Sequence, residues 1–528
     1  MSSYYVENFG CRATQADGAA IERQLQGRGL DRADTAACAG IVVLNTCTVT
    51  AAADQDARAA IRRIRRQNPD CQIVVTGCYA QRAPEEIAAL PGVNLVVGNS
   101  HKTQLADISL RTPGAKAQEL IEAFTAQPKP CSPEPQTAPR RSTEPANGFV
   151  PMEQLTNGQG RTTNNGFQTA EDRRLTTEIY VADIFAHTEL LAAPVFDAAN
   201  ERTRPNLKVQ DGCDNRCSFC VIPYVRGQSR SLPLARVLDE VSALVTAGYR
   251  EVVISGINLG RWGRDLEVAG RSSRGAGQAN STWVGPRRTN DGQRFEFLIR
   301  SILEHTPIEK LRISSVEPMD WSDELIGLMA SSPRIAQHAH VPMQSASDRV
   351  LRTMHRKYRP WHYREKIEKI HAAMPSAGIG ADVMVGFPGE TDADFEATRR
   401  MIEDLPFTYL HVFTYSPRPG TPAASMRAQI PVAIARERNR ILRELAAQKR
   451  LAFMRSLVGK PIQAITLNSR SESKLDGITT ECLTDNYLKL HLKGPHQANR
   501  WITAQIDRVE QGALMGTAKV AHQAAAEV

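Results

Sequence analysis

Apolar runs alternate with amphipathic stretches over the first 110 residues. The runs predict strands at 4–8, 40–45, 72–76 and 95–97, and helices are expected at 19–28 and 51–67. Pro69 ends the second helix, because proline lacks the backbone N–H that the helix needs. Buried strands that alternate with helices are typical of an α/β fold, with an open parallel sheet covered on both faces.

The same β/α rhythm returns between residues 206 and 430. Helices are expected at 234–247 and 363–374, among six apolar runs that predict parallel strands. These strands are expected at 207–210, 251–255, 310–314, 337–341, 380–385 and 409–414. We therefore expect a second α/β unit.

The C-terminal part has a different pattern. Pro431 opens a long, Arg-rich helix that runs to about Leu457. Short strands are then expected at 461–467, 477–482, 487–492 and 501–507, with turn residues between them. Evenly spaced short strands predict a small β-barrel.

Two segments break these patterns. Residues 111–178 are rich in proline and then in Asn, Gln and Gly, so they cannot bury enough apolar surface to offset chain entropy. We expect a long disordered linker or insertion there. Residues 264–294 are polar and basic. They predict a second insertion, which is either a solvated surface loop or a contact to RNA phosphates.

Composition narrows the class of protein. No apolar run approaches the ~18–20 residues that span a bilayer, and no secretory signal is visible, so a cytoplasmic protein with no membrane association is expected. In a reducing compartment, the ten cysteines suggest metal chemistry rather than disulfides. The net charge of +8 is compatible with an RNA partner, although ordinary basic proteins share it.

Three cysteines are concentrated in a C-x3-C-x2-C spacing at Cys213, Cys217 and Cys220. Three thiolates can hold three irons of a 4Fe–4S cluster and leave the fourth iron open to a small molecule. The alternatives are a zinc site that lacks a ligand, or buried structural cysteines. Zinc ligands usually come as two separated pairs, and no second pair is near, so the cluster is favoured.

A second triad comprises Cys11, Cys47 and Cys78, each just past a predicted strand. The carboxyl ends of parallel strands meet at one rim, so these thiols could converge on a second cluster with one open iron. The alternative is three small core residues, since free cysteine is often buried. The remaining cysteines are expected not to be ligands: Cys38, Cys71, Cys131 and Cys482.

The C-x3-C-x2-C motif, with Phe219 directly before its last cysteine, resembles the motif of the radical S-adenosylmethionine enzymes. The resemblance implies a partial (β/α)6 barrel over 199–435. It also implies a cluster on Cys213, Cys217 and Cys220 that binds S-adenosylmethionine and cleaves it to a 5′-deoxyadenosyl radical. The residues implied to line this cofactor are Phe219, Gly256, Asn258, Gln344 and Gly386.

The loops around Cys11, Cys47 and Cys78 resemble the N-terminal domain of the methylthiotransferases, notably Asn45-Thr46-Cys47-Thr48-Val49-Thr50. The resemblance assigns 1–110 to that domain and implies that these cysteines bind a second 4Fe–4S cluster. The family adds a methylthio group to an unactivated carbon. Arg12-Ala13-Thr14-Gln15 departs from the family's usual Lys-Val-Asn-Gln. By position, 458–522 resembles the TRAM domain, which implies RNA binding.

Three segments resemble one branch of the family, which methylthiolates carbon 2 of N6-threonylcarbamoyladenosine at position 37 of tRNA. These segments are residues 45–50, 256–260 and 413–422. The enzyme implied is a tRNA (N6-L-threonylcarbamoyladenosine(37)-C(2))-methylthiotransferase. It would need an electron donor such as flavodoxin or ferredoxin, and a sulfur source. Arg418 is a candidate for the substrate carboxylate, because a guanidinium binds that group bidentately; the alternative is a surface arginine.

Three alternatives remain open. The isopentenyladenosine branch usually carries Gly-Gln-Asn-Val-Asn where this chain has Gly256 to Gly260. Another branch modifies an aspartate of a ribosomal protein. A non-catalytic iron–sulfur sensor that binds RNA would not need the cofactor loops that follow the second, fourth and fifth core strands.

Overall fold

The computed structural model describes residues 3–111, 177–187, 190, 203–266, 294–473 and 477–519. The linker predicted at 111–178 and the insertion predicted at 264–294 fall almost wholly outside these residues, as does Cys131. Within the described ranges, no helix combines the length and the apolar character that a membrane crossing requires.

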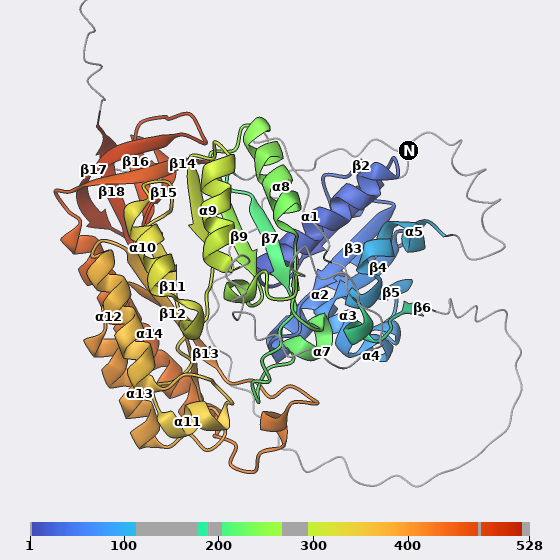
Figure 1. Ribbon diagram of the computed structural model, residues 1–528. Coiled ribbons are helices and arrows are strands. Elements are labelled where there is room, and N and C mark those ends of the chain that lie inside the picture. The colour runs from blue at the N-terminus through green and yellow to red at the C-terminus, as the bar shows by residue number, and fades with distance from the viewer. Residues whose placement is uncertain are drawn as a thin grey trace, which may run out of the picture. The chain divides into compact units, whose positions relative to one another are not determined.

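The N-terminal unit is a six-stranded parallel sheet in the order β2-β1-β3-β4-β5-β6, and helices pack on it (Figure 1). Its strands are β1 (Ser3–Asn8), β2 (Asp31–Arg32), β3 (Ile41–Thr46), β4 (Gln72–Gly77), β5 (Leu95–Gly98) and β6 (Glu178–Tyr180). Its helices are α1 (Arg12–Gly27), α2 (Ala51–Gln67), α3 (Cys78–Arg82), α4 (Pro84–Ala88) and α5 (Leu105–Leu110). Two separate apolar cores confirm the expected open sheet.

Two features of this sheet differ from the prediction. Helix α1 begins at Arg12, directly after Cys11, whereas the apolar periodicity placed its start at residue 19. The periodicity misses the first turns because Thr14 and Asp17 are polar and nevertheless buried there. Strand β6 pairs with β5, so a segment near residue 180 completes a sheet that was expected to end by residue 110.

The central unit contains all six predicted strands. They form two sheets, β10-β9-β7-β8 and β11-β12-β13, and parallel bridges such as Ser315 to His340 connect β10 with β11. The strands are β7 (Asn206–Asp211), β8 (Arg230–Ser231), β9 (Glu251–Gly256), β10 (Lys310–Ile313), β11 (His338–His340), β12 (Gly378–Val385) and β13 (Tyr409–Thr414). The short β8 was not predicted and runs antiparallel to β7.

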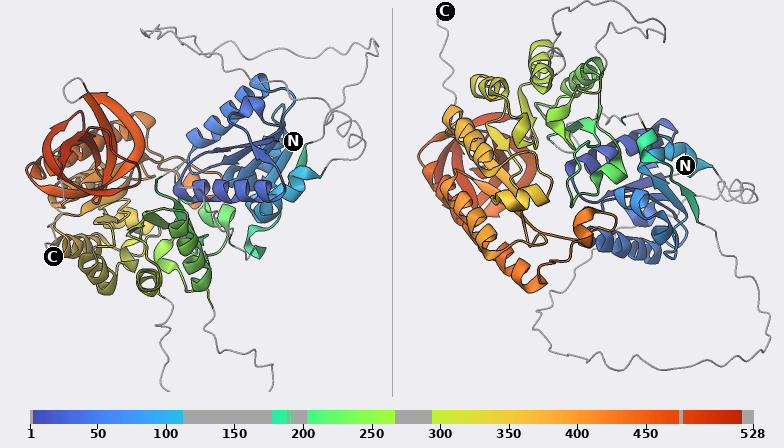
Figure 2. Two further views of the ribbon diagram at one scale, coloured as in Figure 1. Left: turned by 90° about the horizontal axis from the view of Figure 1, so that it is seen from above. Right: turned by 60° about the horizontal axis from the view of Figure 1, so that its bottom comes forward.

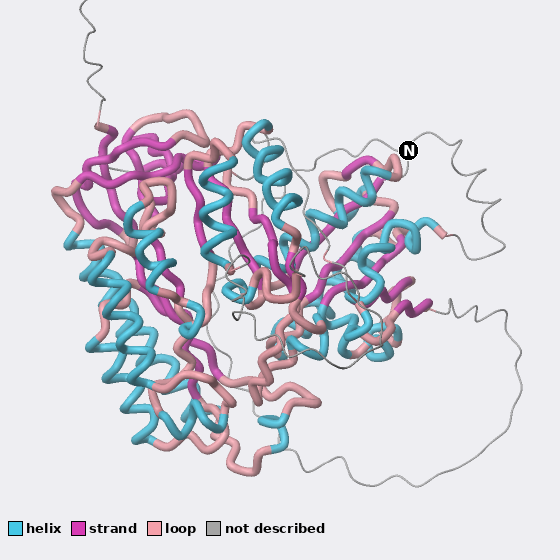
Figure 3. The backbone as a smooth tube through the Cα atoms, viewed as in Figure 1, coloured by secondary structure: helices cyan, strands magenta, loops and turns pink. Residues whose placement is uncertain are grey.

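Helices cover the outside of these strands (Figure 3). They are α7 (Ile222–Arg226), α8 (Leu234–Thr246), α9 (Phe295–His305), α10 (Asp323–Ser331), α11 (Asp348–Thr353), α12 (Pro360–Ala373) and α13 (Asp392–Asp404). A large apolar core lies between the strands and the helices. The arrangement confirms the α/β barrel-like fold.

The C-terminal unit begins with helix α14 (Val432–Ser456) and closes into a five-stranded barrel, drawn in orange and red in Figure 2. Its strands are β14 (Pro461–Ser473), β15 (Gly477–Thr484), β16 (Lys489–Lys493), β17 (Trp501–Glu510) and β18 (Ala513–Ala518). Only four strands were predicted. The fifth, β18, is short and rich in small residues, and pairing with β16 and β17 makes it a strand.

Candidate active site at two cysteine triads

The N-terminal cysteines converge at one rim of the parallel sheet. Cys11 follows β1, Cys47 follows β3 and Cys78 follows β4. Asn8 of β1 is level with Asn45 of β3, and β3 and β4 are aligned to their ends. The three loops therefore leave adjacent strands at the same end, as the carboxyl-end rule for parallel sheets requires. Cys47 and Cys78 are buried and Cys11 is exposed.

Two glycines permit the close approach of these loops. Gly10 and Gly77 both have φ of +99°, a conformation that side chains rarely adopt. A Cβ at Gly10 would lie 2.6 Å from Cys47 Cβ, and one at Gly77 would lie 2.3 Å from the carbonyl oxygen of Thr46. Glycine is thus needed at both positions for the cysteine loops to pack together.

The sulfur environments suit a bound cation. Burial raises the pKa of the Cys47 thiol to about 12, and the nearby sulfurs of Cys78 and Cys11 add to this effect. A bare thiolate is therefore unfavourable, while a metal cation at the sulfurs would favour it. Among the described cysteines, neither triad has all three sulfurs within 4.8 Å of one another, so neither is a compact single-ion site as it stands.

The central triad lies in the loop that follows β7. The backbone N–H of Cys213 donates to Gly227 O at 3.0 Å, and that of Cys220 donates to Cys217 O at 3.1 Å. Burial raises the pKa of Cys213 to about 11 and that of Cys220 to about 12. Arg356 Nη1 donates to Cys217 Sγ at 3.4 Å. Arg356 was not singled out from the sequence, since it comes from a distant segment that follows α11.

Asn258 links the predicted cofactor loop to this triad. Its backbone N–H donates to Gln210 Oε1 at 2.7 Å, and its Nδ2 lies 3.6 Å from Cys213 Sγ. Its Oδ1 is buried and accepts no hydrogen bond from the described residues. An amide oxygen that lacks a donor beside the triad suits the ammonium group of an amino-acid ligand such as S-adenosylmethionine. Gly256 precedes it at the end of β9.

The other predicted cofactor residues also lie in loops after strands. Gln344 has φ of +62°, unusual for a residue with a side chain, and Gly386 has φ of +74°. A Cβ at Gly386 would lie 2.5 Å from Ala435 Cβ, so packing against α14 already explains this glycine. Phe219 stacks edge-on against Phe387, with ring centroids 6.4 Å apart. Contact of these residues with the cofactor stays a prediction.

Arg418 is not a surface residue, which was the alternative considered for it. Its side chain is buried, and its Nη2 lies 2.8 Å from Asp54 Oδ2. Asp54 also pairs with Arg82 at 3.0 Å. One terminal nitrogen of Arg418 is therefore occupied by a partner in the N-terminal unit, and its contact with a substrate carboxylate stays a prediction.

Sequence reasoning missed a group on the adjacent strands β11, β12 and β13. His340 Nε2 and His411 Nδ1 each lie 3.3 Å from Asp382 Oδ1. Although burial opposes ionisation, these two imidazoles hold the pKa of Asp382 below its ordinary value. The three residues are far apart along the chain, so only strand pairing brings them together.

Comparison with known proteins gives two family matches. Residues 3–98 match the "Uncharacterized protein family UPF0004", and residues 207–402 match the Radical SAM superfamily. Each match contains one complete cysteine triad.

Similar proteins align over nearly the whole chain. The threonylcarbamoyladenosine tRNA methylthiotransferase MtaB of Aquifex aeolicus is 31% identical, with 95% of this chain and 99% of that protein covered. The protein of the same name from Bacillus subtilis is 31% identical, with 94% and 91% covered. A tRNA-2-methylthio-N(6)-dimethylallyladenosine synthase of Saccharopolyspora erythraea is 30% identical, with 88% and 78% covered. With this similarity and both cysteine triads in place, the chain belongs to the radical S-adenosylmethionine methylthiotransferase family.

Proposed function

We propose that this protein methylthiolates carbon 2 of N6-threonylcarbamoyladenosine at position 37 of tRNA. The observation that carries the proposal is the presence of two separate cysteine triads, each in loops that follow the carboxyl ends of parallel strands. Relatives named for this activity are similar over 95% and 94% of the chain, which supports the choice of substrate.

The cofactors are two 4Fe–4S clusters and S-adenosylmethionine. Cys213, Cys217 and Cys220 hold one cluster, and Cys11, Cys47 and Cys78 hold the other. Bound there, the first supplies the electron that cleaves S-adenosylmethionine and the second presents the sulfur that is transferred. Separate sites suit two separate tasks, sulfur delivery and radical generation. The radical is needed because neither a base nor an electrophile can activate carbon 2 of adenine.

Residues in the loops that follow the strands of the central unit orient S-adenosylmethionine. The buried Oδ1 of Asn258, which has no partner among the described residues, would accept a hydrogen bond from the ammonium group of S-adenosylmethionine beside Cys213. Phe219, Gly256, Gln344 and Gly386 form the surrounding loops. Arg356 donates to Cys217 Sγ and so stabilises negative charge on that sulfur.

The tRNA reaches this rim through its anticodon loop, because specific readers of RNA usually bind splayed-out single-stranded bases. Arg418 is the candidate for the threonylcarbamoyl carboxylate: its Nη2 is held by Asp54, and its Nε and Nη1 are buried without partners among the described residues. The barrel within 458–522 is the TRAM-like RNA-binding domain. An electron donor such as flavodoxin or ferredoxin and a sulfur source complete the set of partners.

A second substrate deserves a test because the dimethylallyladenosine synthase of Saccharopolyspora erythraea is 30% identical to this chain. Nucleoside mass spectrometry of tRNA from cells with and without the gene is the direct experiment. Loss of the methylthio group only from threonylcarbamoyladenosine is expected. Loss only from the isopentenyl nucleoside would overturn the substrate and leave the family in place, and an unchanged tRNA profile would overturn tRNA modification altogether.

A further inference from the structure

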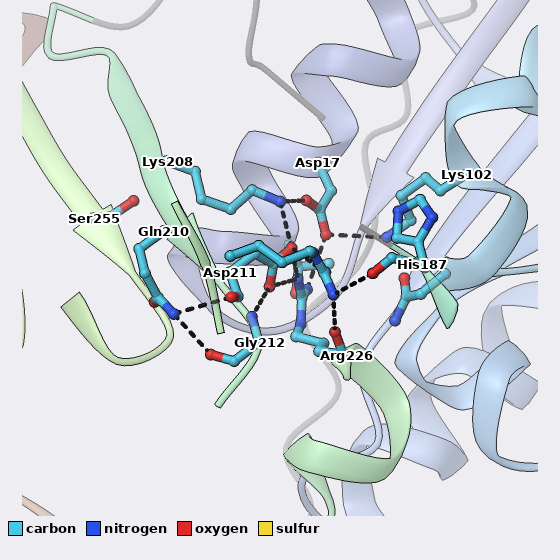
Figure 4. A network of polar contacts seen from close by, with 12 residues as sticks. Asp17, Lys102, His187, Lys208, Gln210, Asp211, Gly212, Arg226 and Ser255 are labelled. Carbon is cyan, nitrogen blue, oxygen red and sulfur yellow. Dashed lines mark hydrogen bonds and ion pairs between the residues drawn. The ribbon is translucent and has the colours of Figure 1, made fainter. Parts of the chain in front are cut away.

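A cluster of six buried charged side chains joins the N-terminal unit to the central unit (Figure 4): Asp17, Lys102, Lys208, Asp211, Arg226 and Arg230. Arg226 donates to Asp17 Oδ2 at 2.8 Å and to both carboxylate oxygens of Asp211, at 2.9 and 3.0 Å. Lys208 pairs with the same two aspartates, and Lys102 Nζ lies 3.0 Å from Asp17 Oδ2. The side chains of Asp17, Lys208 and Arg226 are no more than 2% exposed.

The members of this cluster flank both triads along the chain. Asp17 lies in α1, which begins directly after Cys11. Asp211 ends β7 just before Cys213, and Arg226 ends α7, the helix that follows Cys220. A single guanidinium therefore ties the loop of the central triad to the helix that follows the first cysteine of the N-terminal triad.

Helix α7 is also a wall of the N-terminal triad. Cys78 packs in one small apolar cluster with Val221 and Val225 of the α7 region. Asn99 Nδ2 donates to the carbonyl oxygen of Val225 at 2.7 Å and lies 3.7 Å from Cys78 Sγ. The environment of Cys78 is thus built partly from the segment that carries Cys220.

The cluster carries an excess of positive charge beside the N-terminal sulfurs. Four cations, Lys102, Lys208, Arg226 and Arg230, face two carboxylates, and Arg226 Nε is buried with no hydrogen-bond partner among the described residues. Arg226 directly follows Val225, which packs against Cys78, and its Nη2 donates to Asp17 in the helix that begins after Cys11. The guanidinium thus lies in the wall of the N-terminal triad, where a buried positive charge would favour added negative charge on a bound cluster.

We infer that Arg226 is a positioning residue by which the central unit completes the N-terminal cluster site. It fixes α7 against Cys78 through Asp17 and Asp211, and it places a buried positive charge beside the N-terminal triad. The electronic properties of the N-terminal cluster then depend on a residue from another unit of the chain. This inference rests on the proposed assignment of the six cysteines.

The experiment compares two backgrounds of the full-length chain after anaerobic reconstitution. Replacement of Cys213, Cys217 and Cys220 by Ala leaves the N-terminal cluster alone, and replacement of Cys11, Cys47 and Cys78 leaves the central cluster alone. In each background, Arg226→Gln and Arg226→Lys are compared by iron content and by redox titration followed by electron paramagnetic resonance.

Arg226→Gln is expected to shift the one-electron equilibrium of the N-terminal cluster about tenfold toward the oxidised form, which corresponds to about 59 mV. The reason is that loss of a buried positive charge disfavours the added electron. Arg226→Lys keeps the positive charge and should therefore shift this equilibrium much less. The redox potential of the central cluster should change less than that of the N-terminal cluster. Asp17→Asn removes a negative charge from the same group of buried side chains. It should shift the one-electron equilibrium of the N-terminal cluster in the opposite direction.

Arg312→Gln is the matched control, since Arg312 is also fully buried and paired with an acid, Glu251. This substitution should not shift the redox potential of either cluster selectively. Selective loss of iron from the N-terminal site in Arg226→Gln would support the positioning role. The positioning role would be overturned if Arg226→Gln changed both clusters equally, or if it changed neither potential while the iron content stayed full. Absence of iron from both backgrounds would instead overturn the assignment of the cysteines and the inference with it.

Discussion

The two cysteine triads are built in opposite ways. The central triad lies within one loop after β7, and backbone hydrogen bonds between its own residues and to Gly227 hold it. The N-terminal triad is collected from the ends of three strands, with Gly10 and Gly77 allowing the loops to approach. A local site depends on its own loop, whereas an assembled site depends on sheet register and on neighbouring units. The assembled site should therefore be the more easily damaged by changes elsewhere.

The largest expected effect comes from removal of the central triad. The intact protein should hold about eight irons after anaerobic reconstitution, as two cubane clusters require. Replacing Cys213, Cys217 and Cys220 with Ala should leave about half of that iron and abolish reductive cleavage of S-adenosylmethionine. Iron analysis and an assay for 5′-deoxyadenosine measure both results. Full iron retention in this variant would refute the assignment of the central site.

Removal of the N-terminal triad should separate the two halves of the reaction. With Cys11, Cys47 and Cys78 replaced by Ala, S-adenosylmethionine cleavage should continue, because the central loop does not need these cysteines for its geometry. No methylthio product should form. Product analysis by mass spectrometry tests the division of labour, which retained product formation would contradict.

A single backbone change should show that the N-terminal site is the more fragile. Gly77→Ala forces a Cβ to within 2.3 Å of Thr46 O at φ of +99°. The loss of stability should exceed the about 1–3 kcal/mol that so sparsely populated a backbone conformation alone costs a side chain, and the N-terminal site should lose iron selectively. Gly420→Ala is the matched control, since Gly420 has φ of +84° but nothing within 4 Å of the added atom. Equal iron loss in the two variants would show that backbone strain, and not the clash, disturbs the site.

The same contrast explains what could be predicted from the sequence. The central triad and the strands around it were predictable because cysteine spacing and apolar runs are local properties. The rim position of Cys11, Cys47 and Cys78 followed from a general rule for parallel sheets. The pairing of Asp17 with Arg226 was not predictable, because it joins segments with no shared local pattern. Arg418 likewise proved to be buried against Asp54, although its own loop gives no sign of that partner.

The smallest expected effect concerns the C-terminal barrel, which should act on tRNA binding and on neither triad. Deleting the barrel would be a poor test, because Tyr487 accepts a hydrogen bond from Arg12, and Arg312 donates to Asp485 O. The deletion would therefore also disturb both other units. Changing exposed charges avoids this problem.

Lys460, Lys493 and Arg500 are exposed on the barrel unit. Replacing all three with Gln should weaken tRNA binding and reduce the slope of log affinity against log salt by about two to three, because each lost phosphate contact removes about 0.7–0.9 from the slope. Iron content and S-adenosylmethionine cleavage should not change, since no cysteine of either triad lies in this unit.

The matched control removes the same net charge from the outer helices of the central unit. Arg364, Lys369 and Arg400 lie on α12 and α13, where Lys369 and Arg400 are exposed and Arg364 is half-buried, and each pairs with an acid on the surface. Their replacement by Gln should alter the salt slope by less than the barrel variant does, because their charges do not face tRNA in the proposed arrangement. Equal slopes for the two triple variants, measured by tRNA binding across a salt series, would show that net charge rather than the barrel governs binding. A larger effect of the helix variant would place the tRNA on the central unit and assign the barrel another role.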